Sequence, residues 1–204
     1  MNTPNVTLAG YLLPSNRMTK LALSIGLAVI GSLLLWASAK VKVDLPLVPI
    51  TLQSLAVLGL GAAYGWRLGA ATVLLYLAEG AWGLPVFAGT PAKGIGLAYM
   101  MGPTGGYLVG FLLAAALVGW LAQRGADRNA FRMFGVMLAG AAVIWICGLA
   151  WLFALKTLVT GMPVTAAFAE TVTAGLVPFI VGDLIKAALA AMAFPAAWLM
   201  LDRR

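Results

Sequence analysis

Hydrophobic residues occur along this chain in six long runs, separated by short stretches that hold most of the charged, proline and glycine positions. The runs cover approximately residues 18–39, 48–64, 68–84, 106–121, 131–159 and 176–201. A helix needs roughly 20 apolar residues to cross a bilayer, so the pattern predicts six transmembrane helices. The second, third and fourth runs are short for a full span, which favours tilted or broken helices enclosed by their neighbours.

Composition supports a membrane protein and excludes two other classes. The 204 residues are 63% hydrophobic and only 9% charged, with a mean hydropathy of +1.01. A soluble domain is about half apolar and about a quarter charged. This chain has too few charges to cover a water-exposed surface or to stay disordered. We therefore expect an all-α integral membrane protein, with an N-terminal tail over residues 1–16, loose or interfacial, and a single six-helix membrane domain over 17–204.

The cationic side chains predict how the chain is oriented. Six spans put both termini on one side of the membrane, together with Arg17, Lys20, Arg67, Arg124, Arg128, Arg132, Arg203 and Arg204. The opposite side receives Lys40, Lys42, Lys93 and Lys156. Cytoplasmic loops carry the excess of Lys and Arg, so both termini are expected in the cytoplasm. We attribute the net charge of +7 to this bias rather than to nucleic-acid binding.

Several kinds of chemistry are excluded by what the sequence lacks. There is no His, which removes His-based triads and two-His metal sites. Cys147, the one cysteine, lies in an apolar run and can form no internal disulfide. No GxxxxGK[ST] phosphate loop occurs, so ATP hydrolysis by that route is excluded. We expect no catalytic residues, no cofactor and no metal.

Carboxylates inside apolar runs are the main candidates for a binding site, because an intramembrane charge is costly and by default marks function. Asp183 and Lys186 are three residues apart, hence on one helix face. A self-neutralising structural pair is the alternative, but apolar residues would be cheaper to bury. Glu79 follows Tyr76 by three residues, and together they could hold a flat polar ligand. Asp127, among arginines, is expected in a solvated ion pair.

Other candidates lie near helix ends and in a glycine-rich loop. Thr51 and Gln53 follow a proline-rich stretch, with Thr51 suited to starting a helix and Gln53 to binding a ligand. Residues 83–110 contain eight glycines, and Lys93 could there meet an anionic group. In the first run, Ala22 and Gly26 are four residues apart, a spacing that lets helices approach closely. They are candidates for docking another protein.

Four segments together resemble the hallmark motifs of the BioY family, the biotin-binding S components of energy-coupling factor (ECF) transporters. They are VPITLQSLAVL at 48–58, GLPVFAG at 83–89, GPTGGYLVGF at 102–111 and VGDLIKAALAA at 181–191. The resemblance covers roughly residues 18–200. It implies six helices, an outward-facing pocket for biotin, and a transmembrane coupling subunit with two ATP-binding-cassette ATPases as partners in a prokaryotic cell membrane.

The resemblance also implies roles for particular residues. Asp183 and Lys186 match the family's last-helix pair and Gln53 its second-helix glutamine, which suits the donors and acceptors of a ureido ring. Lys93 is the nearest match to a basic loop residue that meets the biotin carboxylate. Tyr76, Trp82, Phe87 and Tyr99 are candidates for the apolar walls. Ala22 and Gly26 match the spacing of the family's docking face.

Three other functions remain open at this point. An S component for another vitamin would share the same architecture. A solo facilitator or channel would transport without partners. An intramembrane enzyme is also possible, although the absence of His and of paired carboxylates at metal-ligand spacing disfavours it.

Overall fold

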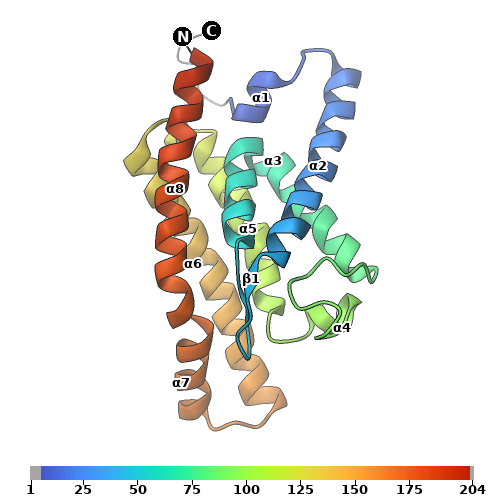
Figure 1. Cartoon of the computed structure of the whole chain (residues 1–204), viewed down its shortest axis with the longest axis vertical. Helices are drawn as coiled ribbons and strands as arrows, with labels where there is room; N and C mark the ends of the chain where they lie inside the picture. Colours follow the sequence, from blue (N-terminus) through green and yellow to red (C-terminus); the bar gives the residue numbers. More distant parts are fainter. Residues whose placement is uncertain (1–5, 203–204) are drawn as a thin grey trace.

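Helices form nearly all the regular structure of the computed structural model, which describes residues 6–202 (Figure 1). They are α1 (Leu8–Leu12), α2 (Arg17–Lys40), α3 (Gln53–Ala81), α4 (Gly96–Met100), α5 (Gly105–Ala122), η1 (Ala126–Arg128), α6 (Ala130–Ala154), η2 (Leu155–Val159), α7 (Val164–Gly175) and α8 (Val177–Asp202). A small antiparallel sheet pairs β1 (Lys42–Val43) with β2 (Ile50–Thr51). The all-α class is confirmed.

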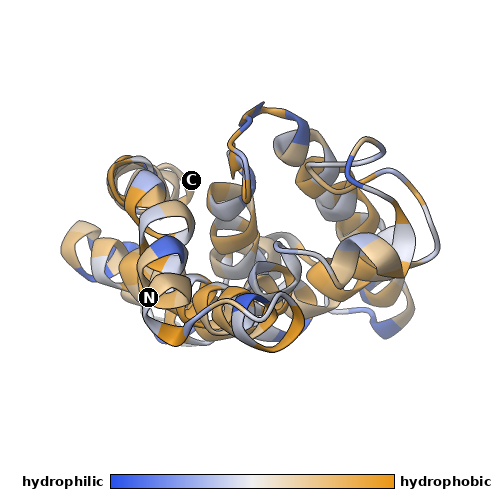
Figure 2. Ribbon diagram, turned by 90° about the horizontal axis from the view of Figure 1, so that it is seen from below, coloured by the Kyte–Doolittle hydropathy of each residue, from blue (hydrophilic) through white to orange (hydrophobic). Residues whose placement is uncertain are grey.

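Five helical stretches are long and apolar enough to cross a membrane. They are Arg17–Lys40, Gln53–Ala81, Gly105–Ala122, Ala130–Val159 and Val164–Leu201. Large apolar side chains point outward from them; on α2, for example, Leu21, Ile25 and Ile30 are all more than half exposed. In the view of Figure 2, the orange of hydrophobic residues recurs along most of the helices. Such a surface is suited to lipid rather than water.

The second and third apolar runs are joined in α3, which contains a sharp reversal at Gly65. This residue has φ +81° and ψ 171°, a conformation that favours glycine. A Cβ on Gly69 would lie 3.0 Å from the Cα of Gly61, whereas eight residues of straight helix span about 12 Å. The two arms of α3, 53–64 and 66–81, therefore run back along each other, as the teal and green arms in Figure 1 show.

Glycines also bring α5 against the turn of α3. A Cβ on Gly61 would lie 2.6 Å from the carbonyl oxygen of Ala115, and one on Gly119 would lie 2.5 Å from the carbonyl carbon of Gly65. Larger residues at these positions would separate the backbones. The recurrent small residues of the sequence thus serve packing within the chain here.

The N-terminal segment is folded over the part that the structure describes. Thr7 caps α1 by accepting a hydrogen bond from the backbone of Gly10, at 3.1 Å. Tyr11 makes an edge-to-face contact with Trp198 near the end of α8, with 6.4 Å between the ring centroids. Within this range the short helix α1 packs against the end of α8; residues 1–5 lie outside the described part.

Asp127 corrects one expectation from the sequence. It is fully buried in η1, not solvated, and its Oδ2 accepts a hydrogen bond from the indole of Trp198 at 2.6 Å. Burial raises the pKa of Asp127 above its usual value, opposed by that hydrogen bond and by nearby Arg128. Asp127 thus fixes the end of α8 to the connection between α5 and α6.

Candidate functional site

A cavity lies at the end of the molecule that carries the β1–β2 ribbon. Its walls come from the ribbon and the start of α3, from the loop after α3 and α4, and from α5, α6 and α8. The lining residues are Val48, Pro49, Thr51, Gln53, Ser54, Phe87, Ala88, Tyr99, Thr104, Tyr107, Leu108, Phe111, Ile144, Trp145, Phe179, Asp183 and Lys186. The free space is about 50 Å³, enough for a few water molecules.

Asp183 and Lys186 form a buried ion pair in one wall of this cavity, 2.9 Å apart, so the prediction that they share a helix face is confirmed. The ammonium of Lys186 also donates to the carbonyl of Thr51 and to Oγ of Ser54, each at 2.8 Å. An ammonium has three donors, and all three are used. The pair therefore joins α8 to the start of α3.

Two further residues complete the surroundings of Asp183. Ser54 donates to Oδ1 at 3.0 Å, and the indole of Trp145 on α6 donates to Oδ2 at 3.0 Å. Neither was a candidate from the sequence. Ser54 could have been found because it directly follows Gln53, but Trp145 lies in an apolar run with nothing to distinguish it. These two contacts fix the carboxylate and leave Oδ2 free to accept another hydrogen bond.

Gln53 offers the cavity an amide nitrogen for which no hydrogen bond is found among the described residues. Its side chain is 3% exposed, and its Nε2 has no hydrogen-bond partner among the described residues. Its backbone N–H donates to Oγ1 of Thr51 at 3.2 Å, which gives a partner to one N–H at the start of α3, although the N-cap position itself is Leu52. A buried unpaired donor costs about 1–3 kcal/mol. A ligand oxygen placed next to Nε2 would remove that cost.

Stacked aromatic rings form the opposite, apolar side of the cavity. Phe87 lies 5.0 Å from Tyr99 with nearly parallel rings, and it packs edge-on against Tyr76 behind it. The ring of Phe87 occupies the space where a Cβ of Gly80 would be. Tyr76 donates to the carbonyl of Val86 at 3.1 Å and does not line the cavity.

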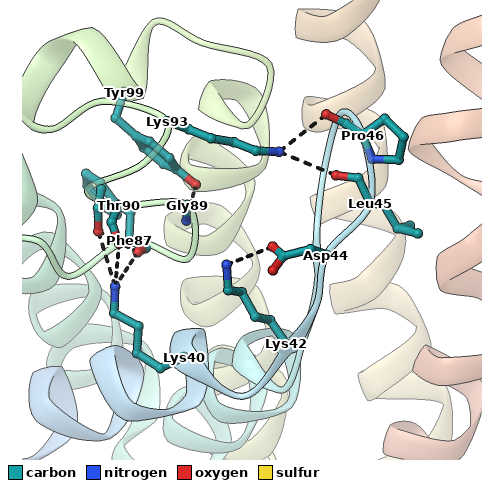
Figure 3. A network of polar contacts seen from close by, with 10 residues as sticks. All are labelled: Lys40, Lys42, Asp44, Leu45, Pro46, Phe87, Gly89, Thr90, Lys93 and Tyr99. Atoms are coloured by element: carbon teal, nitrogen blue, oxygen red, sulfur yellow. Dashed lines mark hydrogen bonds and ion pairs between the residues drawn. The ribbon is translucent and has the colours of Figure 1, made fainter.

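The loop after α3, residues 82–95, and the β1–β2 connection, residues 44–49, both contribute to the wall of the cavity and are together called its roof. Figure 3 shows the lysines that hold these two segments in place. The ammonium of Lys40 donates to the carbonyl of Phe87 at 2.8 Å and to the carbonyl and hydroxyl of Thr90 at 3.2 Å. Lys93, further along the same loop, reaches the β1–β2 connection, where it donates to the carbonyls of Leu45 and Pro46 at 3.4 and 3.3 Å. One lysine thus anchors the loop to α2, and the other bridges it to the ribbon.

The remaining candidates from the sequence lie outside the cavity. Glu79 accepts a hydrogen bond from Ser32 at 2.9 Å and so connects α3 with α2. Trp82 is 90% exposed. Ala22 is exposed on α2, and a Cβ on Gly26 would have no atom within 4 Å, which leaves this face of the helix open.

This arrangement suits binding of a small, largely neutral molecule with both amide-like donors and acceptors. The charges of Asp183 and Lys186 cancel, Oδ2 of Asp183 can accept, and Nε2 of Gln53 can donate. The aromatic side can receive a flat or apolar group. Among the described residues, no three His, Cys, Asp or Glu side chains gather to hold a metal ion.

The chain is similar to known proteins over most of its length. A family model described as "BioY family" matches residues 5–203. The chain is 35% identical to the probable biotin transporter BioY of Pyrococcus horikoshii over 74% of this chain and 82% of that protein. It is 36% identical to the biotin transporter BioY of Thermotoga maritima over 81% of this chain and 89% of that one.

A crystal structure shares the fold. It is described as the S-component for biotin from an ECF-type ABC transporter, and it matches with a TM-score of 0.70 at 23% identity, covering 94% of this chain and 96% of that one. The motifs, the fold and the family model lead to one assignment: the chain belongs to the BioY family.

Proposed function

We propose that this protein is a membrane subunit that captures biotin for uptake. It does so in a prokaryotic cell membrane, with a transmembrane coupling subunit and two ATP-binding-cassette ATPases as partners. Membership of a family of biotin transporters supports this, as does the fold shared with a biotin S component. The single observation that carries it is the buried Asp183–Lys186 pair beside the unpaired amide of Gln53, in one cavity.

The ureido ring of biotin fits the polar wall of the cavity. In our proposal, Oδ2 of Asp183 accepts a ring N–H, and Nε2 of Gln53 donates to the ring carbonyl. Lys186 holds Asp183 in place and can direct one donor to the same carbonyl by releasing Ser54. Thr51 presents its carbonyl to Lys186. Tyr76 and Glu79 are left out of the ligand contacts because neither lines the cavity.

Lys93 is proposed to meet the carboxylate of biotin after the roof opens. The free space of about 50 Å³ is far below the roughly 300–1,000 Å³ of small-molecule pockets, so the ligand must displace part of the roof. The two hydrogen bonds of Lys93 are long, at 3.3 and 3.4 Å, and its side chain is exposed. A carboxylate would give the Lys93 ammonium an acceptor of opposite charge in place of two neutral carbonyls.

In our proposal each of the two arms of α3 crosses the membrane once, which gives six crossings in total and places both termini in the cytoplasm. The Arg-containing ends of α2, α5 and α6 then face the cytoplasm, and the cavity faces outward, where biotin arrives. The open face at Ala22 and Gly26 is proposed to dock the coupling subunit, since small residues permit close helix contact.

The proposed function is tested by calorimetric titration of the purified chain, free of other subunits, in lipid nanodiscs. We expect saturable binding of biotin at one molecule per chain, weaker binding of desthiobiotin, no binding of thiamine and no ATP hydrolysis. Absence of biotin binding by a folded, monodisperse preparation would contradict the proposal. Biotin accumulation in liposomes containing this chain alone would instead favour a solo facilitator.

A further inference from the structure

An apolar groove lies at the other end of the molecule, outside the biotin site. Leu8 and Leu13 at α1, Leu23 and Leu27 on α2, and Ala63 and Tyr64 on α3 line it. Its volume of about 340 Å³ is within the range of small-molecule sites.

Water would find few partners in this groove. The one polar side-chain group of its lining, the hydroxyl of Tyr64, already donates to the carbonyl of Leu27 at 3.1 Å. A buried water needs two to four polar partners. The groove therefore suits an apolar occupant.

Two Trp–Arg pairs lie at this end of the molecule, an arrangement that favours the level of lipid headgroups. The guanidinium of Arg124 lies 3.4 Å from the ring centroid of Trp120, and that of Arg67 lies 5.0 Å from the ring centroid of Trp66. Both tryptophans are about 40% exposed. Tryptophan rings with cations beside them are typical of the membrane–water interface. Trp66 lies two residues beyond Tyr64, which lines the groove, so this pair and the groove are close together in the chain.

Two cations lie in the first turn of α2, next along the helix to the leucines that line the groove. Lys20 precedes Leu23 by three residues and Leu27 by seven, which puts it on the same face of α2. Arg17 lies one turn earlier, and both side chains are exposed. Neither forms an ion pair with an acidic side chain that the structure describes. The acidic side chain that the structure describes at this end is that of Asp127, which is fully buried against Trp198.

We propose that this groove binds one anionic phospholipid. An acyl chain lies along Leu23 and Leu27, and the phosphate lies between Arg17 and Lys20. The chemistry requires both parts: the groove accepts only an apolar chain, and the free cations select an anionic headgroup. The site is separate from the biotin cavity, and the lipid ties α1 to α2 and α3.

The test uses delipidated full-length protein in detergent, to which phosphatidylglycerol or phosphatidylcholine of identical chains is added. Native mass spectrometry counts bound lipid, and thermal melting measures stabilisation. We expect one phosphatidylglycerol to be retained, with a larger rise in Tm than phosphatidylcholine gives. Arg17→Gln with Lys20→Gln should weaken phosphatidylglycerol by roughly tenfold or more and leave phosphatidylcholine unchanged. Biotin affinity should stay unchanged.

Matched variants distinguish lipid binding in this groove from a general attraction of anionic lipid to the cations at this end of the protein. Arg132→Gln removes an exposed cation at the same end but off the groove, and should have little effect. Leu27→Trp should fill the groove and abolish lipid retention, whereas Leu33→Trp, on an exposed position of α2, should not. Glycerol phosphate, the headgroup without chains, should give no stabilisation.

Three outcomes would overturn the proposal. The first is equal stabilisation by the two lipids. The second is an equal loss in Arg132→Gln and in the double variant. The third is a wild-type protein that is dimeric with or without lipid and becomes monomeric in Leu27→Trp. This result would mean that a second copy of the chain, rather than a lipid, occupies the groove. Biotin binding by each variant confirms that it is folded.

Discussion

Two lysine–carboxylate pairs in this protein have the same length and different surroundings. Lys186 and Asp183 are 2.9 Å apart, as are Lys156 and Glu170. In the first pair, both side chains are at most 13% exposed. In the second, the lysine is buried but the glutamate is 44% exposed. The second pair connects η2 to α7 and does not line the cavity.

Surroundings, rather than distance, distinguish the pair that we propose to bind the ligand from the pair that we do not. Asp183 and Lys186 contact Thr51, Ser54 and Trp145 from three other segments. A buried pair is usually no more stable than apolar residues in its place, so a buried network of this kind favours a purpose other than stability. A half-exposed pair such as Lys156–Glu170 contributes about 0–1 kcal/mol, which is enough to explain it as a link between helices.

The largest effect is expected for Asp183→Asn. This change keeps the size of the side chain, but it leaves Lys186 without its counter-charge and places a donor where a ligand N–H would bind. Breaking a buried pair costs about 3–5 kcal/mol, here divided between stability and affinity. We expect biotin affinity to fall by about 100-fold, measured by calorimetry alongside a thermal melt. Wild-type affinity in this variant would remove Asp183 from the ligand contacts.

A smaller effect is expected for Trp145→Phe. The ring stays, but the hydrogen bond to Oδ2 of Asp183 is lost, and hydrogen bonds to charged groups are worth about 1.5–3 kcal/mol. We expect roughly a tenfold loss of biotin affinity. Trp151→Phe is the matched control, because its indole donates to the carbonyl of Gly102, outside the cavity. Equal losses in both variants would show that Trp145 acts only through packing.

The smallest effect is expected for Lys93→Ala, because this lysine is exposed and its charge is partly screened by water. Biotin should bind about three- to tenfold more weakly, and biotinamide, which has no carboxylate, should change less. Lys42→Ala, which removes a neighbouring cation paired with Asp44, is the control. A loss of the same size for both ligands would leave Lys93 with a role in the roof only.

Sequence reasoning could predict what depends on local spacing. The apolar runs give the helices, and the three-residue spacing gives the shared face of Asp183 and Lys186. The role predicted for Thr51 at a helix start agrees with its Oγ1, which accepts the backbone N–H of Gln53 at the start of α3.

Contacts between distant segments could not be predicted in this way. Trp145 reaches Asp183 across 38 residues, and Glu79 meets Ser32 across 47. Nothing in the local pattern distinguishes these residues from others in apolar helices. The burial of Asp127 was missed for the same reason, because its partner Trp198 lies 71 residues away. The helix α7 was missed because its exposed polar positions interrupt the apolar pattern.

The central claim is that the Asp183–Lys186 pair binds biotin and the Lys156–Glu170 pair does not. The most direct measurement compares two neutral double variants, Asp183→Leu with Lys186→Met and Glu170→Leu with Lys156→Met, by biotin titration of folded protein. We predict at least about a tenfold loss, equivalent to about 1.4 kcal/mol, in the first variant and a change within about twofold in the second. Wild-type biotin affinity in the first variant, with its fold intact, would contradict this account and make the pair structural.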